Sequence, residues 1–315
     1  MSVPRGLKLV VAGVLLALLA LGVDWQALPE QVARLDWRFA AVALVAIVLE
    51  MVVNASKWSW ALRLHDLAFP WGYLFRIGCF GYFFNNFLPS AIGGDVYRVY
   101  RTMKPGVARS RAVSAVLVER LVGFGVMLAI GAAGALWLAR TSELARWYLW
   151  SAAAIALGGL LALAVLALWR TGPLRALLAR VTWLEPVRDN LRRIRRPGRE
   201  WLGLLAYSCM FQALVLVVIC CAFAAVGDAI SLPAAALVTG AAGVASVLPI
   251  SVSGLGVVEG SIVGTAVAVG VGYDAALLAA VVVRLLSLLV GAGCGLLYLV
   301  EGGREPRPPS PEMAS

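Results

Sequence analysis

The sequence has little of the chemistry that soluble enzymes use. Histidine occurs once, at position 65, and the five cysteines lie in apolar segments without the spacing of metal ligands. Nucleophile–base constellations, phosphate-binding glycine loops and paired zinc-ligand motifs are missing, and only 14% of the residues are charged. We therefore expect neither an enzyme nor a bound metal or cofactor, with an enzyme that acts on lipids as the open alternative.

Apolar residues are what the sequence has in excess. They fill 62% of 315 positions, with a mean hydropathy of +0.88, whereas soluble domains are about 45–50% apolar. Several segments exceed the roughly 20 apolar residues that cross a bilayer core. We predict an all-α polytopic membrane protein with about six full transmembrane helices. These lie near residues 7–23, 39–60, 112–139, 147–169, 201–226 and 275–300, and a cleavable signal peptide is the alternative for the first.

The charges alternate from loop to loop. Residues 24–37 are mainly acidic, whereas the segment after the second span, with Lys57 and Arg98 counted in it, and the linker 170–199 are basic. Because cytoplasmic loops are rich in Lys and Arg, we expect a bacterial inner-membrane protein with both termini in the cytoplasm. The net charge of +10 then indicates contact with anionic lipid rather than nucleic acid.

Two segments predicted to lie at the cytoplasmic face, residues 170–199 and 301–315, differ in composition from the apolar spans. The linker 170–199 has apolar residues at helical spacing between arginines, which predicts either an amphipathic helix on anionic inner-leaflet lipid or an ordinary positive loop. Residues 301–315 are polar and rich in proline, which predicts a disordered cytoplasmic tail.

A polar element occurs twice within the apolar sequence. In each copy a Leu-Pro pair is followed, five residues after the proline, by a glycine. A carboxylate comes next, and an arginine follows 25 residues after that carboxylate. The first copy has Pro89, Gly94, Asp95 and Arg120, and the second has Pro249, Gly254, Glu259 and Arg284. We expect the two glycines to be equivalent and intolerant of valine, whereas Gly240→Val, outside the element, should be much milder.

The segments that contain these elements, residues 71–98 and 232–270, fit the charge pattern only if each leaves and re-enters the membrane on the same side. We therefore predict two re-entrant helical hairpins. The units 39–139 and 201–300 are then joined by one span, so that the second is inverted relative to the first within an integral membrane domain over residues 1–300. A homo-oligomer is a further expectation.

The charged residues within the apolar segments can be interpreted in two ways. Each costs about 2.5–3.5 kcal/mol in the membrane, so the two carboxylates are expected either to pair with the two arginines or to shape a head-group site. Glu119 beside Arg120 is expected to be partly self-compensating, and the tip glycines to leave amides free for an anion. Glu50 and Asn54, one helical turn apart, are candidates for the cavity wall, and Glu50 for a proton site. The candidate substrate-binding residues are Asn85, Asn86, Pro89, Gly93, Gly94, Asp95, Arg98, Glu119, Arg120, Pro249, Ser251, Ser253, Gly254, Gly256, Glu259 and Arg284.

The first motif, Asn85-Asn86-Phe-Leu-Pro followed by Gly94-Asp95-x-x-Arg98, together with Glu119-Arg120 and the second copy, resembles a known family over roughly residues 5–300. This is the lysylphosphatidylglycerol synthase transmembrane (flippase) family. In the multiple-peptide-resistance proteins such a region precedes a cytoplasmic aminoacyl-transferase domain. This chain continues only over residues 301–315 after its last predicted span, so it resembles the stand-alone members.

The resemblance implies lipid translocation. With no ATP-binding motif, we expect a scramblase-like or ion-coupled carrier of an anionic or polyprenyl-phosphate-linked lipid. One alternative is a transporter of a small polar solute, which requires a closed cavity rather than gaps toward lipid. The other is a non-transporting accessory subunit that docks a lipid-modifying enzyme through its basic linker.

Overall fold

The computed structural model describes residue 30 and residues 33–87, 93–103, 109–168, 198–247 and 254–300. Within these ranges the chain forms helices and no strands. The predicted first span, the tips with Pro89, Pro249, Ser251 and Ser253, the tail, and all but the last two residues of the basic linker lie outside the described residues. The helices are α3 (Trp37–Arg63), α4 (Trp71–Phe87), α5 (Gly93–Thr102), α6 (Arg109–Leu138), α7 (Glu143–Leu168), α10 (Gly198–Val226), α11 (Leu232–Val247), α12 (Val257–Ala268) and α13 (Tyr273–Val300).

Five of these helices, α3, α6, α7, α10 and α13, are long and apolar enough to cross a membrane. They coincide with the second to sixth predicted spans, with ends that differ by a few residues. The start of α3 has a physical reason, because the Asp36 carboxylate caps it by accepting the N–H of Arg38 at 2.9 Å. The prediction of an all-α polytopic membrane protein is confirmed.

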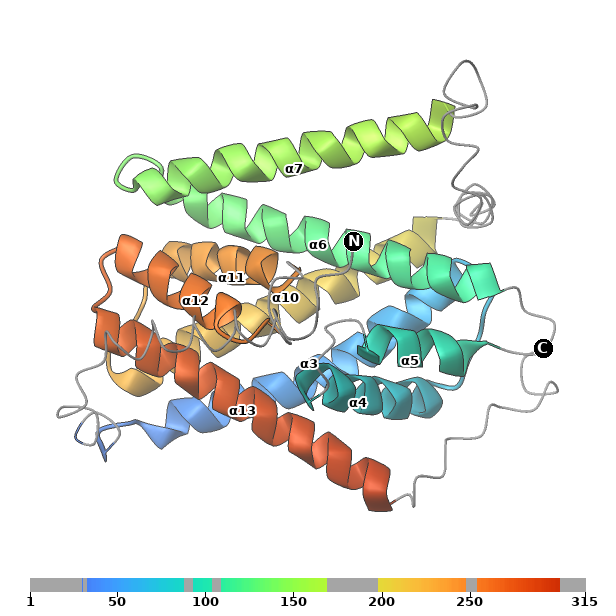
Figure 1. The fold of residues 1–315 in the computed structure, drawn as a ribbon, viewed down its shortest axis with the longest axis horizontal. Helices are drawn as coiled ribbons and strands as arrows, with labels where there is room; N and C mark the ends of the chain where they lie inside the picture. Colours follow the sequence, from blue (N-terminus) through green and yellow to red (C-terminus); the bar gives the residue numbers. More distant parts are fainter. Residues whose placement is uncertain are drawn as a thin grey trace, which may run out of the picture.

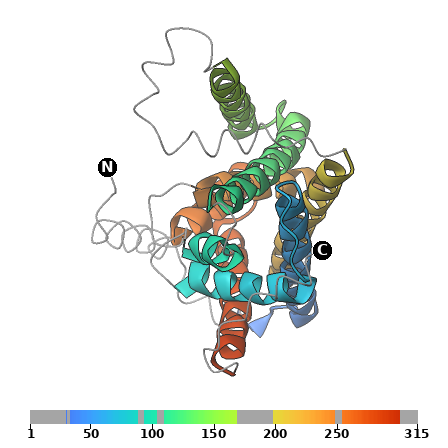
Figure 2. The same cartoon turned by 90° about the vertical axis from the view of Figure 1, so that its right-hand side faces the viewer.

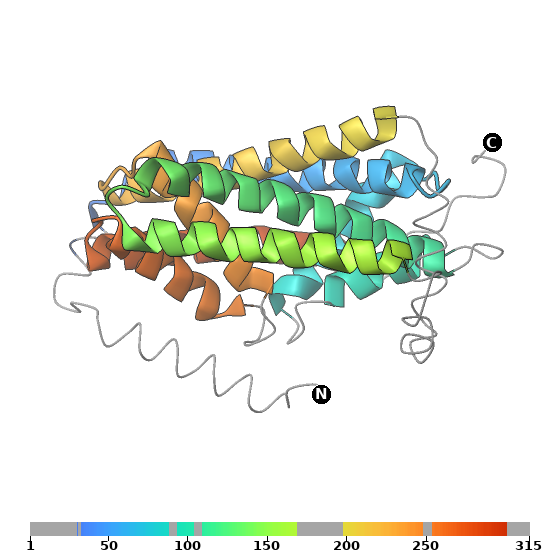
Figure 3. The same ribbon diagram turned by 90° about the horizontal axis from the view of Figure 1, so that it is seen from above.

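Two pairs of shorter helices lie between the long ones. α4 packs against α5, and α11 packs against α12. The pairs enter the molecule from opposite ends, and each reverses direction near the middle of its long dimension (Figures 1 and 3). The facing ends of the short helices, those of α4 and α5 and those of α11 and α12, therefore lie near the middle of the molecule.

The contacts between helices form matching sets in the two halves, α3–α6 and α10–α13. α4 lies on α13 and α11 lies on α6, so each first hairpin helix packs against the last helix of the other half. α3 and α10 pack against each other, and the N–H of Asp36 donates to the carbonyl of Ala225 at 2.9 Å. The start of one central helix therefore meets the end of the other.

The outer surface is adapted to an apolar surrounding. α5 buries Arg98 and Arg101 while its apolar Val96 and Tyr100 are 61% and 59% exposed, the reverse of a helix in a soluble protein. α7 mainly contacts α6 and stands at the edge of the bundle (Figure 2). Only 6% of its apolar window is buried, so lipid must cover most of it.

Candidate functional site

The two predicted ion pairs are present and occupy equivalent places. Asp95 is the third residue of α5 and Glu259 the third of α12, while Arg120 is the twelfth of α6 and Arg284 the twelfth of α13. Arg120 Nη2 lies 2.7 Å from Asp95 Oδ2, and Arg284 Nε contacts Glu259 Oε1. Each pair ties the second hairpin helix to the long helix that follows it.

The equivalence of Gly94 and Gly254, predicted from the Leu-Pro spacing, does not hold. Gly94 is the second residue of α5, whereas Gly254 precedes the first residue of α12 by three positions. Asp95 and Glu259 do correspond. When the two copies are aligned on these carboxylates, the proline and the glycine of the second copy lie four residues further upstream than those of the first. The charge pairs therefore define the repeat better than the glycines do.

Two of the tip amides, those of Gly94 and Gly256, are already occupied, contrary to the expectation that they are free for an anion. The N–H of Gly94 donates to Asn85 Oδ1 at 2.8 Å, and the N–H of Gly256 donates to Glu259 Oε2 at 2.8 Å. Both side chains satisfy orphan donors at a helix start. Asn86 donates from Nδ2 to the carbonyl of Tyr82 at 2.9 Å. Asn85 and Glu259 therefore stabilise the hairpins, and these two amides are not open to an anion.

The first half contains a larger charge cluster than the sequence predicted. Glu119 does not pair with Arg120, because neighbours on a helix point about 100° apart. Its Oε2 lies 2.8 Å from Arg98 Nη2 and its Oε1 lies 3.1 Å from Lys57 Nζ. The guanidinium of Arg98 also stacks 4.3 Å from the ring of Trp58.

Lys57 and Arg98 were counted among the cytoplasmic loop charges, and this was wrong. Lys57 is 8% exposed in α3 and Arg98 is 5% exposed in α5. Lys57 follows Glu50 by seven residues and Asn54 by three, a spacing that places all three on one helical face. This row of polar residues on one helical face was the feature of the sequence from which the burial of Lys57 could have been predicted.

The cluster has one accessible cation and a surplus of positive charge. Three basic side chains, Lys57, Arg98 and Arg120, meet two carboxylates, Asp95 and Glu119, which gives a net charge of +1. The Arg120 side chain is 57% exposed, whereas those of Lys57 and Arg98 are 11% and 6% exposed. Arg120 is therefore the member of the cluster that a ligand can reach.

The remaining predicted residues fall in different places. Glu50 lies in the interior stretch of α3 and is 8% exposed, with Asn54 partly buried one turn later. Gly93 begins α5. Among the described residues, no group of three His, Cys, Asp or Glu side chains is arranged to hold a metal ion.

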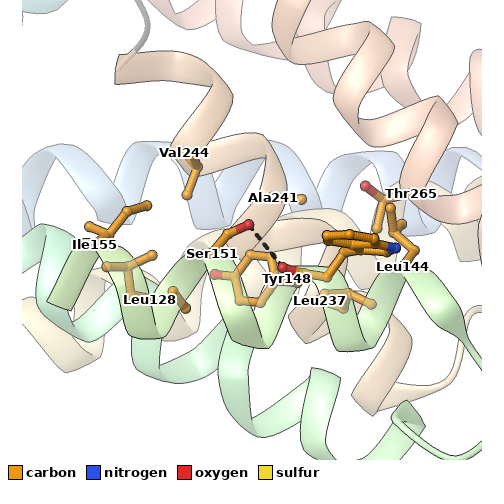
Figure 4. A pocket seen from close by; sticks show the side chains of 11 residues that line it. Leu128, Leu144, Tyr148, Ser151, Ile155, Leu237, Ala241, Val244 and Thr265 are labelled. Atoms are coloured by element: carbon orange, nitrogen blue, oxygen red, sulfur yellow. Dashed lines mark hydrogen bonds between the residues drawn. The ribbon is translucent and has the colours of Figure 1, made fainter. Parts of the chain in front are cut away.

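An apolar groove of about 240 Å³ lies between α7 and the bundle. Its walls come from α6, α7, α11 and α12, with Leu128, Ile155 and Val244 at one end and Leu144 and Thr265 at the other (Figure 4). Leu128 follows Arg120 by two helical turns, and Thr265 follows Glu259 by less than two. Two of the helices that carry the charges, α6 with Arg120 and α12 with Glu259, therefore also form walls of the groove.

The comparisons agree with this architecture. Among the curated proteins, none matches the chain. The sequence pattern of the lysylphosphatidylglycerol synthase TM region matches residues 6–295. A match over this length, on a multi-pass helical fold with paired intramembrane charges, means that the chain belongs to the lysylphosphatidylglycerol synthase TM-region family, whose members are membrane proteins linked to lipid handling.

Proposed function

We propose that this protein is a carrier, not an enzyme, that moves an anionic lipid across a bacterial inner membrane. The observation that carries the proposal is the exposed Arg120 in a cluster of net charge +1, on a helix that continues into an apolar groove. A lipid presents these two chemistries together, an anionic head group and an acyl chain. Arginine recognises phosphate by charge-assisted hydrogen bonds, and the groove offers room for a chain rather than a polar solute.

The groove also supports lipid over a small polar solute. Its volume of about 240 Å³ is below the range of about 300–1,000 Å³ typical of small-molecule sites, and its lining is almost wholly apolar. It lies against α7, the most lipid-exposed of the long helices. A solute carrier would need a closed polar cavity in this position.

The path that we propose runs between two inverted halves. None of α4, α5, α11 and α12 exceeds 17 residues, fewer than the roughly 20 that span the core, which supports re-entrant hairpins from opposite sides. The matching helix contacts support a two-fold relation between the halves, as in transporters with inverted repeats. We place the Arg63–Trp71 connection in the cytoplasm and the Val226–Leu232 connection outside.

A head-group-resolved assay in vesicles tests the proposal. Purified protein is reconstituted with fluorescent phosphatidylglycerol or phosphatidylcholine, and dithionite bleaches label that reaches the outer leaflet. We expect protein-dependent movement that favours the anionic lipid. Arg120→Gln should slow it about 10- to 100-fold, the effect of one charge-assisted hydrogen bond.

Two comparison variants separate binding from folding. Arg120→Gln leaves Asp95 with Arg98 at 3.5 Å, so the variant should fold, whereas Arg98→Gln removes a buried partner from both Asp95 and Glu119 and should lower the folded yield. Arg34→Gln, which breaks an exposed pair with Glu30, should transport normally. Absence of protein-dependent movement for every lipid, or a wild-type rate in folded Arg120→Gln, contradicts the proposal.

A further inference from the structure

Glu50 is a buried carboxyl group without an ion pair among the residues that the structure describes. It is 8% exposed in the interior stretch of α3. Asp95, Glu119 and Glu259, in contrast, each contact an arginine. An isolated carboxylate in an apolar interior is so costly that it takes up a proton instead, and unpaired intramembrane acids of this kind serve in proton relays.

The surroundings of Glu50 connect the two halves of the protein. On its own helix, Lys57 lies two turns away and acts on the Glu50 charge, while its Nζ holds Glu119 at 3.1 Å. On α4, Tyr82 interacts with Glu50 and with Ser287 of α13. Glu50 therefore lies between the cluster of the first half and the helix that carries the ion pair of the second.

Among the titratable groups around this stretch of α3, Lys57 is the cation whose charge acts on Glu50. Cys221 of α10 packs on the neighbouring apolar residues, and Cys294 of α13 lies beside Tyr82. From α6, Glu119 and Arg120 act on Lys57. Lys57 therefore connects Glu50 with the cluster, since it acts on the Glu50 charge and contacts Glu119.

We propose that Glu50 is a proton-binding site and that its proton is coupled to the anion bound at the charge cluster. This inference rests on the proposed lipid translocation. Ionised Glu50 competes with a ligand anion for the positive charge of Lys57, and protonated Glu50 does not. Proton and anionic head group therefore bind together, and by linkage each raises the affinity of the cluster for the other.

The coupling gives a direction to transport. One proton is taken from water on one side as the carboxyl O–H bond forms, and it is released on the other side as that bond breaks. The anionic head group crosses in the same step, so the two charges cancel. A pH gradient should therefore drive anionic lipid into the leaflet that faces the alkaline side.

The test uses the full chain in vesicles that contain fluorescent phosphatidylglycerol, with and without an imposed pH gradient. The measured quantity is the ratio of lipid moved in the two conditions, so that a change in overall rate cancels. We expect wild type to enrich lipid on the alkaline side and a protonophore to abolish the enrichment. Glu50→Gln, which mimics the protonated acid, should bring the ratio to unity. Glu143→Gln, at an exposed pair with Arg146, should keep the wild-type ratio.

A second readout does not depend on a folded variant. Dicyclohexylcarbodiimide reacts with protonated carboxyl groups in apolar surroundings, and peptide mapping of wild type should find it on Glu50 but not on Asp95 or Glu119. Movement of lipid at equal pH with no response to the gradient, or no label on Glu50, overturns this inference and leaves the proposed function standing. If no lipid moves under either condition, the proposed function itself fails.

Discussion

Gly94 and Gly254 both exclude a side chain, but for different physical reasons. A Cβ at Gly94 would collide with the carbonyl oxygen of Gly81 and lie 2.7 Å from Asn85 Oδ1, so the close approach of α4 and α5 requires glycine there. Gly254 instead has φ of +73°, in the left-handed region that other residues avoid. The sequence predicted the same requirement for glycine at both tips, whereas the structure gives a different reason at each.

Gly94→Ala should therefore be destabilising even though alanine favours helix. The obstacle at Gly94 is backbone, which cannot turn aside, so we expect a loss of about 1–3 kcal/mol in the free energy of unfolding. Gly78→Ala in α4 is the matched control, because a Cβ there meets nothing within 4 Å, and it should be neutral or stabilising. Thermal unfolding in detergent, followed by tryptophan fluorescence, measures both. Equal melting temperatures would contradict the close contact of the hairpin.

His65 provides a pH dependence outside the membrane-spanning segments. It lies in the turn after α3, is 5% exposed, and its Nε2 meets no partner within the described part of the chain. Burial, and then the positive charge of Arg111, lower the pKa of His65 from 6.5 to about 4. Between these values the unfolded chain binds the proton and the folded chain does not, so stability falls as pH falls through this window.

The expected loss is on the order of 3 kcal/mol by pH 4, since each pH unit contributes about 1.4 kcal/mol. Carboxylates also titrate in this range, so the informative quantity is the difference between wild type and His65→Asn. The melting temperature of the variant should fall less steeply between pH 6.5 and pH 4. Parallel curves for the two proteins would show that His65 is accessible to protons in the folded state.

At the scale of whole helices, the sequence predicted most of the elements. Long apolar runs predicted α3, α6, α7, α10 and α13, and the Leu-Pro breaks predicted two interrupted segments. The 25-residue spacing predicted both ion pairs. In each half the carboxylate is the third residue of a short helix and the arginine is the twelfth residue of the long helix that follows. Hydropathy does not show which faces of two helices pack together. The contacts of Glu119 with Lys57 and Arg98 were missed for that reason.

The crossing of α6 and α11 is another contact that the sequence hid. A Cβ on Gly240 would lie 2.6 Å from the Cα of Gly131, with the Tyr148 hydroxyl of α7 equally close to both glycines. Small residues let two helices approach closely in a membrane, and here they also receive a side chain from a third helix. Valine at Gly240, which the sequence predicted to be much milder than at the tips, would therefore separate α11 from α6.

At the scale of the molecule, each hairpin packs against a long helix of the opposite half as well as against its own half. α4 rests on α13 and α11 rests on α6, so a movement of one half displaces the hairpin of the other. The asymmetry lies in charge, because the first half has a cluster of net charge +1 and the second a neutral pair.

The arrangement places the connections after α3 and α10 at opposite ends of the bundle, and the loop charges predict which end is cytoplasmic. The connection after α3 and the basic linker should lie in the cytoplasm, and the connection after α10 outside, because α3 and α10 run in opposite directions. With the five native cysteines replaced, an impermeant maleimide should label Asp228→Cys in intact cells. It should label Ala68→Cys and Arg192→Cys only after permeabilisation. Arg98 is unsuitable as a reporter because it is buried in α5. Labelling of position 192 from outside would reverse the orientation, and labelling of positions 68 and 228 from the same side would contradict α3 and α10 as antiparallel spans.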